Sequence, residues 1–192
     1  MMYKIEIPML QTIWTTYFPT FSPAIWISFI PLICILTTYW VVGLSHLFLD
    51  VYKYPEFLYK YKLQKSERTQ ITSKQISKLF KNVILSQLTL FLPIACILYY
   101  TYNDDPTSIG FRLDAKIPSL IEMCKDIFIF IIVEELMFFY AHWTLHQPMF
   151  YSKIHKVHHQ FTAPVALACI YAHPIEVLLG NILPMLTGIV YF

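Results

Sequence analysis

The chain has 192 residues, of which 57% are hydrophobic and only 14% are charged, against about 25% charged residues in soluble domains. The apolar residues gather in long blocks, so the composition excludes an ordinary soluble domain and predicts an all-α integral membrane protein. The net charge of +2 is too small to indicate nucleic-acid binding. Four cysteines in apolar surroundings lack CxxC spacing, and we expect buried thiols instead of disulfides or metal ligands: Cys34, Cys96, Cys124 and Cys169.

The first segment, residues 1–22, is aromatic, rich in threonine and nearly uncharged, and we expect an irregular or interfacial lead-in. A spanning helix needs about 20 apolar residues. No Lys, Arg, Asp or Glu occurs from Ile7 to Leu49, so we place the first span at 24–46. This block is too long for a signal peptide core and should stay as an anchor. For His46, near its end, we favour a place at the bilayer interface over a ligand role.

Residues 50–82 differ sharply from their surroundings because basic side chains crowd them. The positive-inside rule therefore predicts a cytosolic loop. Thr72 and Gln75 have the spacing of a capping box, and the apolar stripe that follows predicts a helix resting on the lipid headgroups. The basic residues are Lys53, Lys60, Lys62, Lys65, Arg68, Lys74, Lys78 and Lys81.

A second uncharged block, residues 83–102, has spanning length and ends at the turn-forming residues 103–106. The loop that continues to Lys116 should be lumenal. A third span is expected at 118–140, although it contains Glu134 and Glu135. Acidic residues inside lipid are costly and usually functional.

The two glutamates differ in their helical position relative to the histidines that follow. At about 100° per residue, Glu135 shares a face with His142 and His146, whereas Glu134 points about a quarter turn away. A carboxylate on that face could accept the spare imidazole N–H and orient a ligand. Glu135 is therefore our first candidate for this role and Glu134 the second. The alternative for both is a salt bridge or a side chain that reaches the interface.

Six of the seven histidines lie between residues 134 and 176. Residues three or four apart share one face of a helix, so each of two clusters can aim imidazoles at one point. Imidazole suits iron, zinc and copper. Pro148 should break the helix between the clusters. Three spans return the chain to the cytosol, which predicts a cytosolic metal site. The histidines are His142 and His146, then His155, His158 and His159, and finally His173.

The remaining segments narrow the chemistry. Ala163–Ala172 is too short to span, so we expect it to be re-entrant or to cover the site, and the block 175–192 begins a partial fourth span. The HWTLH motif at 142–146 lacks the glutamate of HExxH, which disfavours a zincin protease. A histidine-lined transporter would place its ligands near mid-bilayer, whereas these clusters follow the third span. A redox-active site that oxidises a lipid C–H bond remains.

The same residues resemble a known family. His142-x-x-x-His146, His155-x-x-His158-His159 and Tyr171-Ala172-His173-Pro174-x-Glu176 look like the fatty acid hydroxylase/sterol desaturase superfamily. The match is to its C4-methylsterol oxidase branch, in particular the group of fatty acid hydroxylase domain-containing protein 2. Weaker features that extend the resemblance upstream to about residue 35 are Asp50, Pro55, Tyr61-Lys62-Leu63-Gln64, Asn82, Gln87 and the Glu134-Glu135 pair.

The resemblance implies a multi-pass enzyme of the endoplasmic reticulum membrane, all-α in fold, which oxidises sterols or acyl lipids in lipid biosynthesis. It implies two iron ions, O2, and electrons from NAD(P)H through cytochrome b5 or a similar carrier. The metal ligands it implies are His142, His146, His155, His158, His159 and His173.

The family also has a third histidine box, of the form HxxHH, downstream of the YAHP segment, but no histidine follows His173 here. We therefore expect an N-terminal membrane region over 1–117 and, over 118–192, an incomplete hydroxylase domain with two boxes. Two hypotheses follow. The chain is a diiron oxygenase whose third box lies elsewhere in the gene or in another subunit. Alternatively, it is a truncated, non-catalytic form that acts as a membrane interaction protein, by pairing with itself or with a full-length relative.

Overall fold

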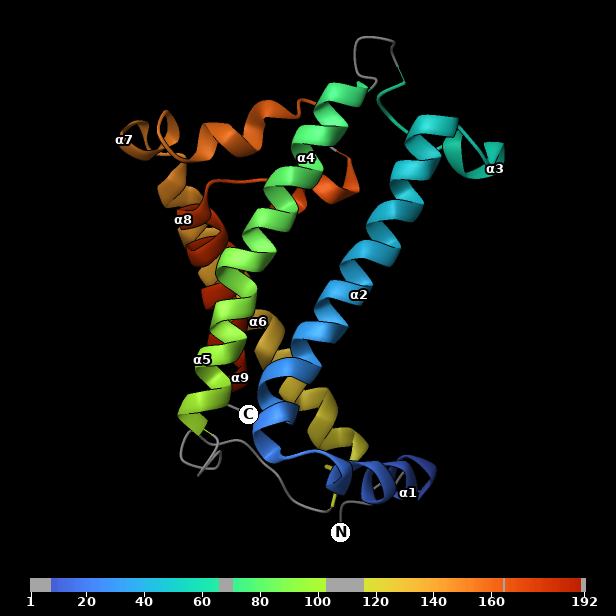
Figure 1. Cartoon of the computed structure of the whole chain (residues 1–192), viewed down its shortest axis with the longest axis vertical. Helices are drawn as coiled ribbons and strands as arrows, with labels where there is room; N and C mark the ends of the chain where they lie inside the picture. Colours follow the sequence, from blue (N-terminus) through green and yellow to red (C-terminus); the bar gives the residue numbers. More distant parts are fainter. Residues whose placement is uncertain (1–7, 66–70, 103–115, 164, 191–192) are drawn as a thin grey trace.

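The computed structural model describes residues 8–65, 71–102, 116–163 and 165–190, and these are helical throughout apart from turns and short connections (Figure 1). The predicted all-α class is confirmed. The α-helices are α1 (Pro8–Tyr17), α2 (Pro23–Tyr52), α3 (Glu56–Tyr59), α4 (Ser73–Ser86), α5 (Leu92–Tyr102), α6 (Leu120–Leu145), α7 (Pro148–Tyr151), α8 (Pro174–Val177) and α9 (Leu183–Val190). The 3-10 turns are η1 (Phe18–Thr20), η5 (His155–Gln160) and η6 (Ala166–Ile170), and the π turns are η3 (Gln87–Phe91) and η7 (Leu178–Ile182).

Two helices among the described residues are long and apolar enough to cross a membrane. One is α2, and the other is the continuous helix Ser73–Tyr102 formed by α4, η3 and α5, each of 30 residues. A helix of that length measures about 45 Å, against about 30 Å for the hydrocarbon core. The predicted spans 24–46 and 83–102 lie within these helices, but both helices continue beyond the predicted ends.

The start of α4 confirms one prediction and corrects another. Thr72 Oγ1 accepts from the Gln75 backbone N–H at 3.3 Å, and Gln75 Oε1 accepts from the Thr72 N–H at 2.9 Å, which completes the predicted capping box. The helix that follows does not lie separately on the headgroups, because it runs without interruption into the second span. Residues 73–82 of the predicted loop are therefore helical.

The N-terminal lead-in is more regular than predicted. Residues 8–17 form α1, which lies at the lower end of α2 (Figure 1). The Trp14 and Phe18 rings stack at 4.4 Å between centroids, and Trp26 Nε1 donates to the Phe18 carbonyl at 2.9 Å. This aromatic cluster joins α1 and η1 to the start of α2.

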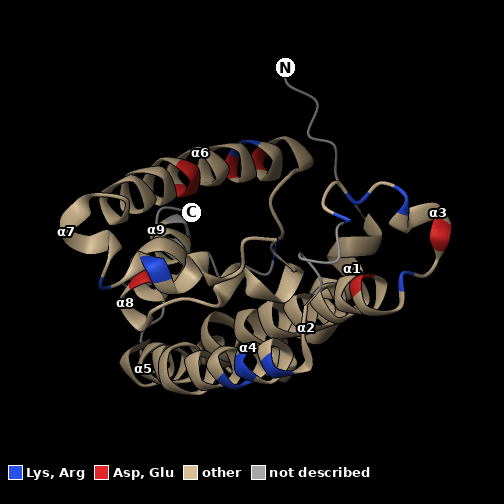
Figure 2. Cartoon of the chain, turned by 90° about the horizontal axis from the view of Figure 1, so that it is seen from above, with Lys and Arg blue, Asp and Glu red and all other residues tan. Residues whose placement is uncertain are grey.

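The predicted third span corresponds to α6, which has 26 residues but is not among the two candidate spanning helices. Acidic side chains occur along it (Figure 2). A third membrane crossing stays a prediction. The block predicted as a partial fourth span folds as α8, η7 and α9 and packs along α6, where Thr187 Oγ1 donates to Met137 Sδ at 2.9 Å.

The short apolar segment before His173 fills the space between α2 and α4. Leu167 and Ala168 of η6 are buried together with Leu47, Leu79 and Val83, and Tyr39 donates its hydroxyl to the Leu167 carbonyl at 2.6 Å. The segment is thus a wedge in the protein core. It holds the upper ends of the two long helices apart (Figure 1).

A second packing cluster lies lower, where the two π turns meet. Leu90 and Phe91 of η3 pack against a buried group that includes Ile182 of η7. At the first residue of η3, Gln87 Oε1 accepts from Trp40 Nε1 at 3.1 Å, which links η3 to α2. The upper half of the long helix therefore packs on η6 and its lower half on η7.

All four cysteines are free, as predicted, but three of them are exposed on the protein surface, namely Cys34, Cys124 and Cys169. The prediction that they are buried is wrong for these three, because they lie on outward faces of their segments, and Cys96 is only half-buried. The predictions for residues 103–115, including the lumenal loop, and for Arg68 lie outside the described residues. The basic residues of α4 and the histidine segment share one end of the bundle (Figures 1 and 2).

We predict that Gly43→Val lowers the stability of the chain, because Gly43 of α2 lies directly against the wedge. A Cβ at Gly43 would lie 2.2 Å from Leu167 Cδ2 and 2.9 Å from its Cγ. Forcing extra atoms into such a packed core costs roughly 1–3 kcal/mol. Thermal unfolding in detergent, followed by tryptophan fluorescence, should show a lower melting temperature.

Gly180→Ala is the matched control, because a Cβ at Gly180 would meet nothing within 4 Å. Equal melting temperatures for the Gly43→Val variant and the unmodified chain would show that η6 does not press on α2.

Candidate metal centre

The predicted break at Pro148 brings the two histidine clusters together. Helix α6 ends at Leu145 with His146 as its C-cap, so His142 and His146 lie in its last turn. Pro148 lacks an N–H and starts the short helix α7, as proline favours at a first helical position. The chain then turns back through η5, which carries the second cluster.

Four imidazoles converge through their Nε2 atoms, and we call His142, His146, His155 and His159 the Nε2 cluster. Successive Nε2 atoms lie 3.1 Å apart from His142 to His146, 3.1 Å from His146 to His155 and 2.9 Å from His155 to His159. Metal–imidazole bonds of about 2.0–2.1 Å place neighbouring ligand nitrogens roughly 2.9–3.4 Å apart. The ligand atoms of His142, His146 and His155 all lie within 4.8 Å of one another, so these three side chains fit a single metal ion, and His159 adjoins them through His155.

His155 is the fully buried member of the cluster, with none of its surface exposed. Its Nδ1 lies 2.8 Å from Glu176 Oε1, on α8. A carboxylate can only accept a hydrogen bond, so the Glu176 carboxylate favours the tautomer with the proton on Nδ1. That tautomer leaves the Nε2 lone pair of His155 facing the other three imidazoles.

Burial sets the charge state of this pair. Burial, together with the neighbouring imidazoles, lowers the pKa of His155 to about 4. The pKa of His159 is also lowered, mainly by burial. Burial raises the pKa of Glu176 to about 8, and its second oxygen, Oε2, is buried without a hydrogen-bond partner in the described part of the chain. Neutral imidazoles next to a carboxylate that can hold or release a proton suit a site that takes up a metal cation.

The other two predicted ligands make hydrogen bonds to the backbone. The ring of His158 stacks near that of His155 at 5.8 Å between centroids, as the three-residue repeat of a 3-10 turn requires, and its Nδ1 lies 3.3 Å from the Tyr171 carbonyl. His173 caps α8 instead, with its Nδ1 accepting from the Ile175 N–H at 3.2 Å. Metal binding by His158 and His173 stays a prediction.

Within residues 116–163, neither of the two glutamates proposed from helical spacing forms a hydrogen bond or ion pair with the Nε2 cluster. Glu135 is exposed and Glu134 is half-buried on α6, so a supporting role for either stays a prediction. The carboxylate that does contact a clustered histidine is Glu176. The sequence pointed to Glu176 only through its place in the YAHPIE motif, because no helical periodicity connects residue 176 with residue 155. His46 is remote, and its Nδ1 lies 2.9 Å from the Val42 carbonyl on α2.

Residues 127–192 match the sequence profile of the fatty acid hydroxylase family. Over 93% of its length the chain is 30% identical to human fatty acid hydroxylase domain-containing protein 2, and it covers 53% of that protein. Methylsterol monooxygenase 2-2 of Arabidopsis thaliana is 29% identical over 74% of the chain and 50% of its own length. Fatty acid hydroxylase ahd1 of Mycosarcoma maydis is 33% identical over 78% of the chain and 37% of its own length.

The chain thus spans about half the length of the first of these relatives. No solved structure matches it.

We predict that Glu176→Gln weakens metal retention by about 10–100-fold, the usual effect of removing a carboxylate that orients a ligand histidine. The amide keeps the shape of the side chain but can turn its NH2 toward His155. Metal per chain after dialysis against a graded chelator is the measurement. Glu135→Gln is the comparison, because its predicted supporting role would give a similar loss. Unchanged retention in that variant would remove Glu135 from the site, and unchanged retention in Glu176→Gln would remove Glu176.

In the metal-free chain, His155 should contribute a loss of stability as the pH falls from about 6.5 to about 4, whereas Glu176, whose pKa burial raises to about 8, contributes in the opposite sense, so the prediction concerns the difference from a chain without His155. The pKa of His155 is lowered in the fold, so the unfolded chain binds its proton first, and protonation favours unfolding. The melting temperature measured across this range should fall less steeply in His155→Gln, which lacks the titrating imidazole. If the melting temperatures of the two chains fell equally with pH, the lowered pKa of His155 would be contradicted.

Proposed function

Because this chain belongs to the fatty acid hydroxylase/sterol desaturase superfamily, a family of lipid oxygenases and hydroxylases, we propose that it carries part of the active site of a membrane-bound diiron oxygenase. Its reaction would hydroxylate or oxidise a C–H bond of a sterol or an acyl lipid. The observation that supports this most directly is the convergence of four Nε2 atoms, at one end of a bundle with two helices that could cross a membrane.

The chemistry of the donor set agrees with iron. The cluster offers only imidazole nitrogens, which suit iron, and has no thiolate. His142, His146 and His155 would hold one ion, and His158, His159 and His173 are the residues left to contribute to a second, together with ligands from the remainder of a longer protein. Bound iron would supply O2 activation, which an alkane C–H bond requires because no acid–base pair can polarise it.

Side chains around the Nε2 cluster would favour the binding of a metal ion. The lowered pKa of His155 keeps its imidazole neutral at neutral pH. Uptake of a cation would favour the ionised form of Glu176, which then accepts the hydrogen bond from Nδ1–H of His155 and leaves Nε2 free to bind. Buried Tyr171 and Val177 lie in the same segment as Glu176 and belong to the two core clusters, which keep water from that side. His146 and His159 are exposed, so the cluster is accessible from its other side.

The reaction also needs an electron supply. Reduction of O2 to water takes four electrons, and insertion of oxygen into a C–H bond provides two of them, so an external donor must provide the other two. We propose cytochrome b5 or a similar carrier, fed by NAD(P)H, at the surface where exposed Lys153 and Lys156 flank the histidines. The substrate would come from the membrane, which we propose to be that of the endoplasmic reticulum.

The first test is the metal content of residues 1–192 purified in mild detergent. Retained iron that depends on the Nε2 cluster supports the oxygenase. A chain that holds no metal and co-purifies with a longer relative would instead support the non-catalytic alternative.

In the complete protein, His158→Ala should abolish incorporation of labelled oxygen from O2 into membrane lipid, because a proposed iron ligand is lost. His46→Ala is the matched control, since the same residue type is removed far from the cluster, and it should keep activity. Mass spectrometry of extracted sterols and fatty acids measures both variants. Full activity in His158→Ala would remove that residue from the site.

A further inference from the structure

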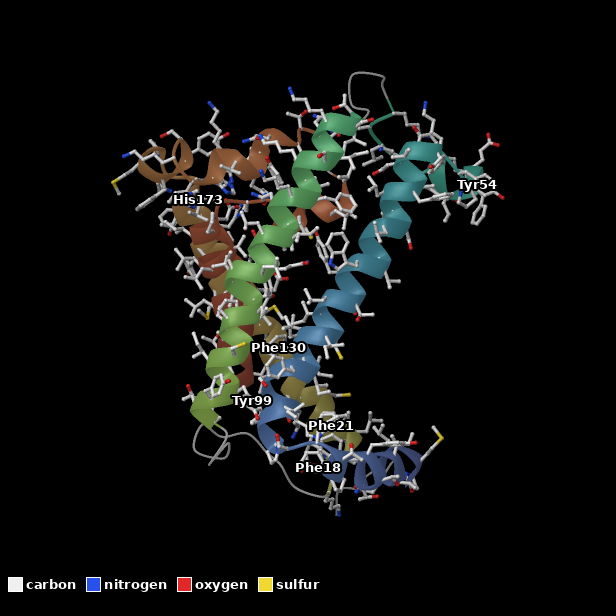
Figure 3. All side chains as sticks on the ribbon, viewed as in Figure 1. Phe18, Phe21, Tyr54, Tyr99, Phe130 and His173 are labelled. Carbon is white, nitrogen blue, oxygen red and sulfur yellow. The ribbon has the colours of Figure 1, made fainter. Side chains whose placement is uncertain are left out.

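A second site lies on the opposite side of α2 from the histidines, where the chain folds back on itself. Lys53, the C-cap of α2, adopts the left-handed backbone conformation at φ 56°. The chain then reverses, and α3 lies against the outer side of the end of α2 (Figure 1). Tyr54 and His173 accordingly lie at opposite edges of the molecule (Figure 3).

Between α2 and the turn that leads into α3 lies a cavity of about 520 Å³ that is open on one side. This volume is within the size range of small-molecule sites. One wall is a stripe on α2 and the other is the turn with α3. The apolar groups that form these walls are Leu44, Phe48, Leu49, Tyr54, Pro55 and Leu58. Several of them remain well exposed, including Phe48 at 49% and Leu58 at 47%. An apolar concavity that stays exposed at the end of a helix able to cross a membrane suits a lipid chain.

Two polar side chains line the same cavity, and both are tied to the helix behind them. Ser45 donates its hydroxyl to the Val41 carbonyl at 2.7 Å. The Val42 carbonyl can only accept, so His46 donates from Nδ1, which leaves its Nε2 available at the cavity wall. The cavity is therefore apolar along its length, with one polar atom that can accept a hydrogen bond from a hydroxyl of a headgroup.

The charges around the cavity indicate the kind of lipid. The segment from Lys53 to Lys65 carries four lysines and one glutamate. Lys62 pairs with Asp50, whereas Lys53 and Lys60 have no carboxylate partner among the described residues. Lys60 lies over the ring of Tyr61, with Nζ 4.9 Å from the centroid. Free ammonium groups beside exposed aromatic rings are typical of a membrane interface that attracts anionic headgroups.

We propose that this cavity, at the elbow between α2 and α3, binds one anionic phospholipid. An acyl chain lies between α2 and α3, and the phosphate is near Lys53 and Lys60. The site is separated from the Nε2 cluster by α2 and does not depend on the presence of metal. Bound lipid would fasten the elbow to the membrane surface.

The test is photo-crosslinking of the whole chain in nanodiscs, with phospholipids that carry a diazirine in one acyl chain. Phosphatidylglycerol should give adducts within residues 44–58, and phosphatidylcholine at equal concentration should give several-fold fewer. Leu44→Trp, which fills the cavity with an apolar group, should remove these adducts. Val41→Trp is the matched control on an exposed position outside the cavity wall and should keep them.

The charge requirement has its own comparison. Lys53→Gln with Lys60→Gln should lower the affinity for phosphatidylglycerol roughly tenfold or more, because two lysines near an anionic surface contribute to binding. Lys74→Gln with Lys81→Gln removes the same charge from α4 and should have little effect. Melting temperature and metal content, unchanged in all variants, show that each folds.

Three results would overturn the proposal. They are adducts that map outside residues 44–58, equal labelling by the two lipids, and equal losses from the two lysine pairs. Absence of any adduct would show that protein, not lipid, covers the cavity.

Discussion

The hydrogen bond between His155 and Glu176 joins the parts of the molecule on which the candidate site depends. It connects η5 to α8 across 21 residues at 2.8 Å, and both side chains are buried. A buried polar pair is costly to separate, because each group would then lack a partner away from water. This bond fixes the orientation of the central imidazole, and the other members of the Nε2 cluster gather around it. The wedge η6 lies in the chain between these two partners, so the packing of the helices and the geometry of the site are coupled.

The features that could be predicted are those with a local cause. Proline at 148 ended α6, the Thr72–Gln75 spacing gave the capping box, and the long apolar blocks became long helices. The histidine spacing likewise determined which imidazoles share a face within each cluster. Each of these outcomes depends on residues within about four positions of one another, which a repeat of 3.6 residues describes well.

The features that could not be predicted depend on contacts between distant segments. Glu176 became the partner of His155 because α8 packs beside η5, whereas helical periodicity pointed to Glu135 on α6. From its apolar composition and short length, the Ala163–Ala172 segment was expected to be re-entrant or to cover the site. It is a core wedge, because Gly43 leaves room for Leu167. Apolar character alone cannot distinguish contact with lipid from contact with protein.

The π turn η3 changes which side of the long helix Ser73–Tyr102 faces each packing partner. A π turn inserts one residue into an α-helix, which rotates everything beyond it by about 100° relative to an uninterrupted helix. In Ser73–Tyr102 the insertion lies where the packing partner changes, from the wedge at Leu79 and Val83 to η7 at Leu90 and Phe91. In an uninterrupted helix at about 100° per residue, Leu79, Val83 and Leu90 would share one face, so the inserted residue turns Leu90 away from the face that packs on the wedge and toward η7. The helix therefore has two segments, α4 and α5, whose packing faces differ in direction, and η3 sets the rotation about the helix axis between these faces.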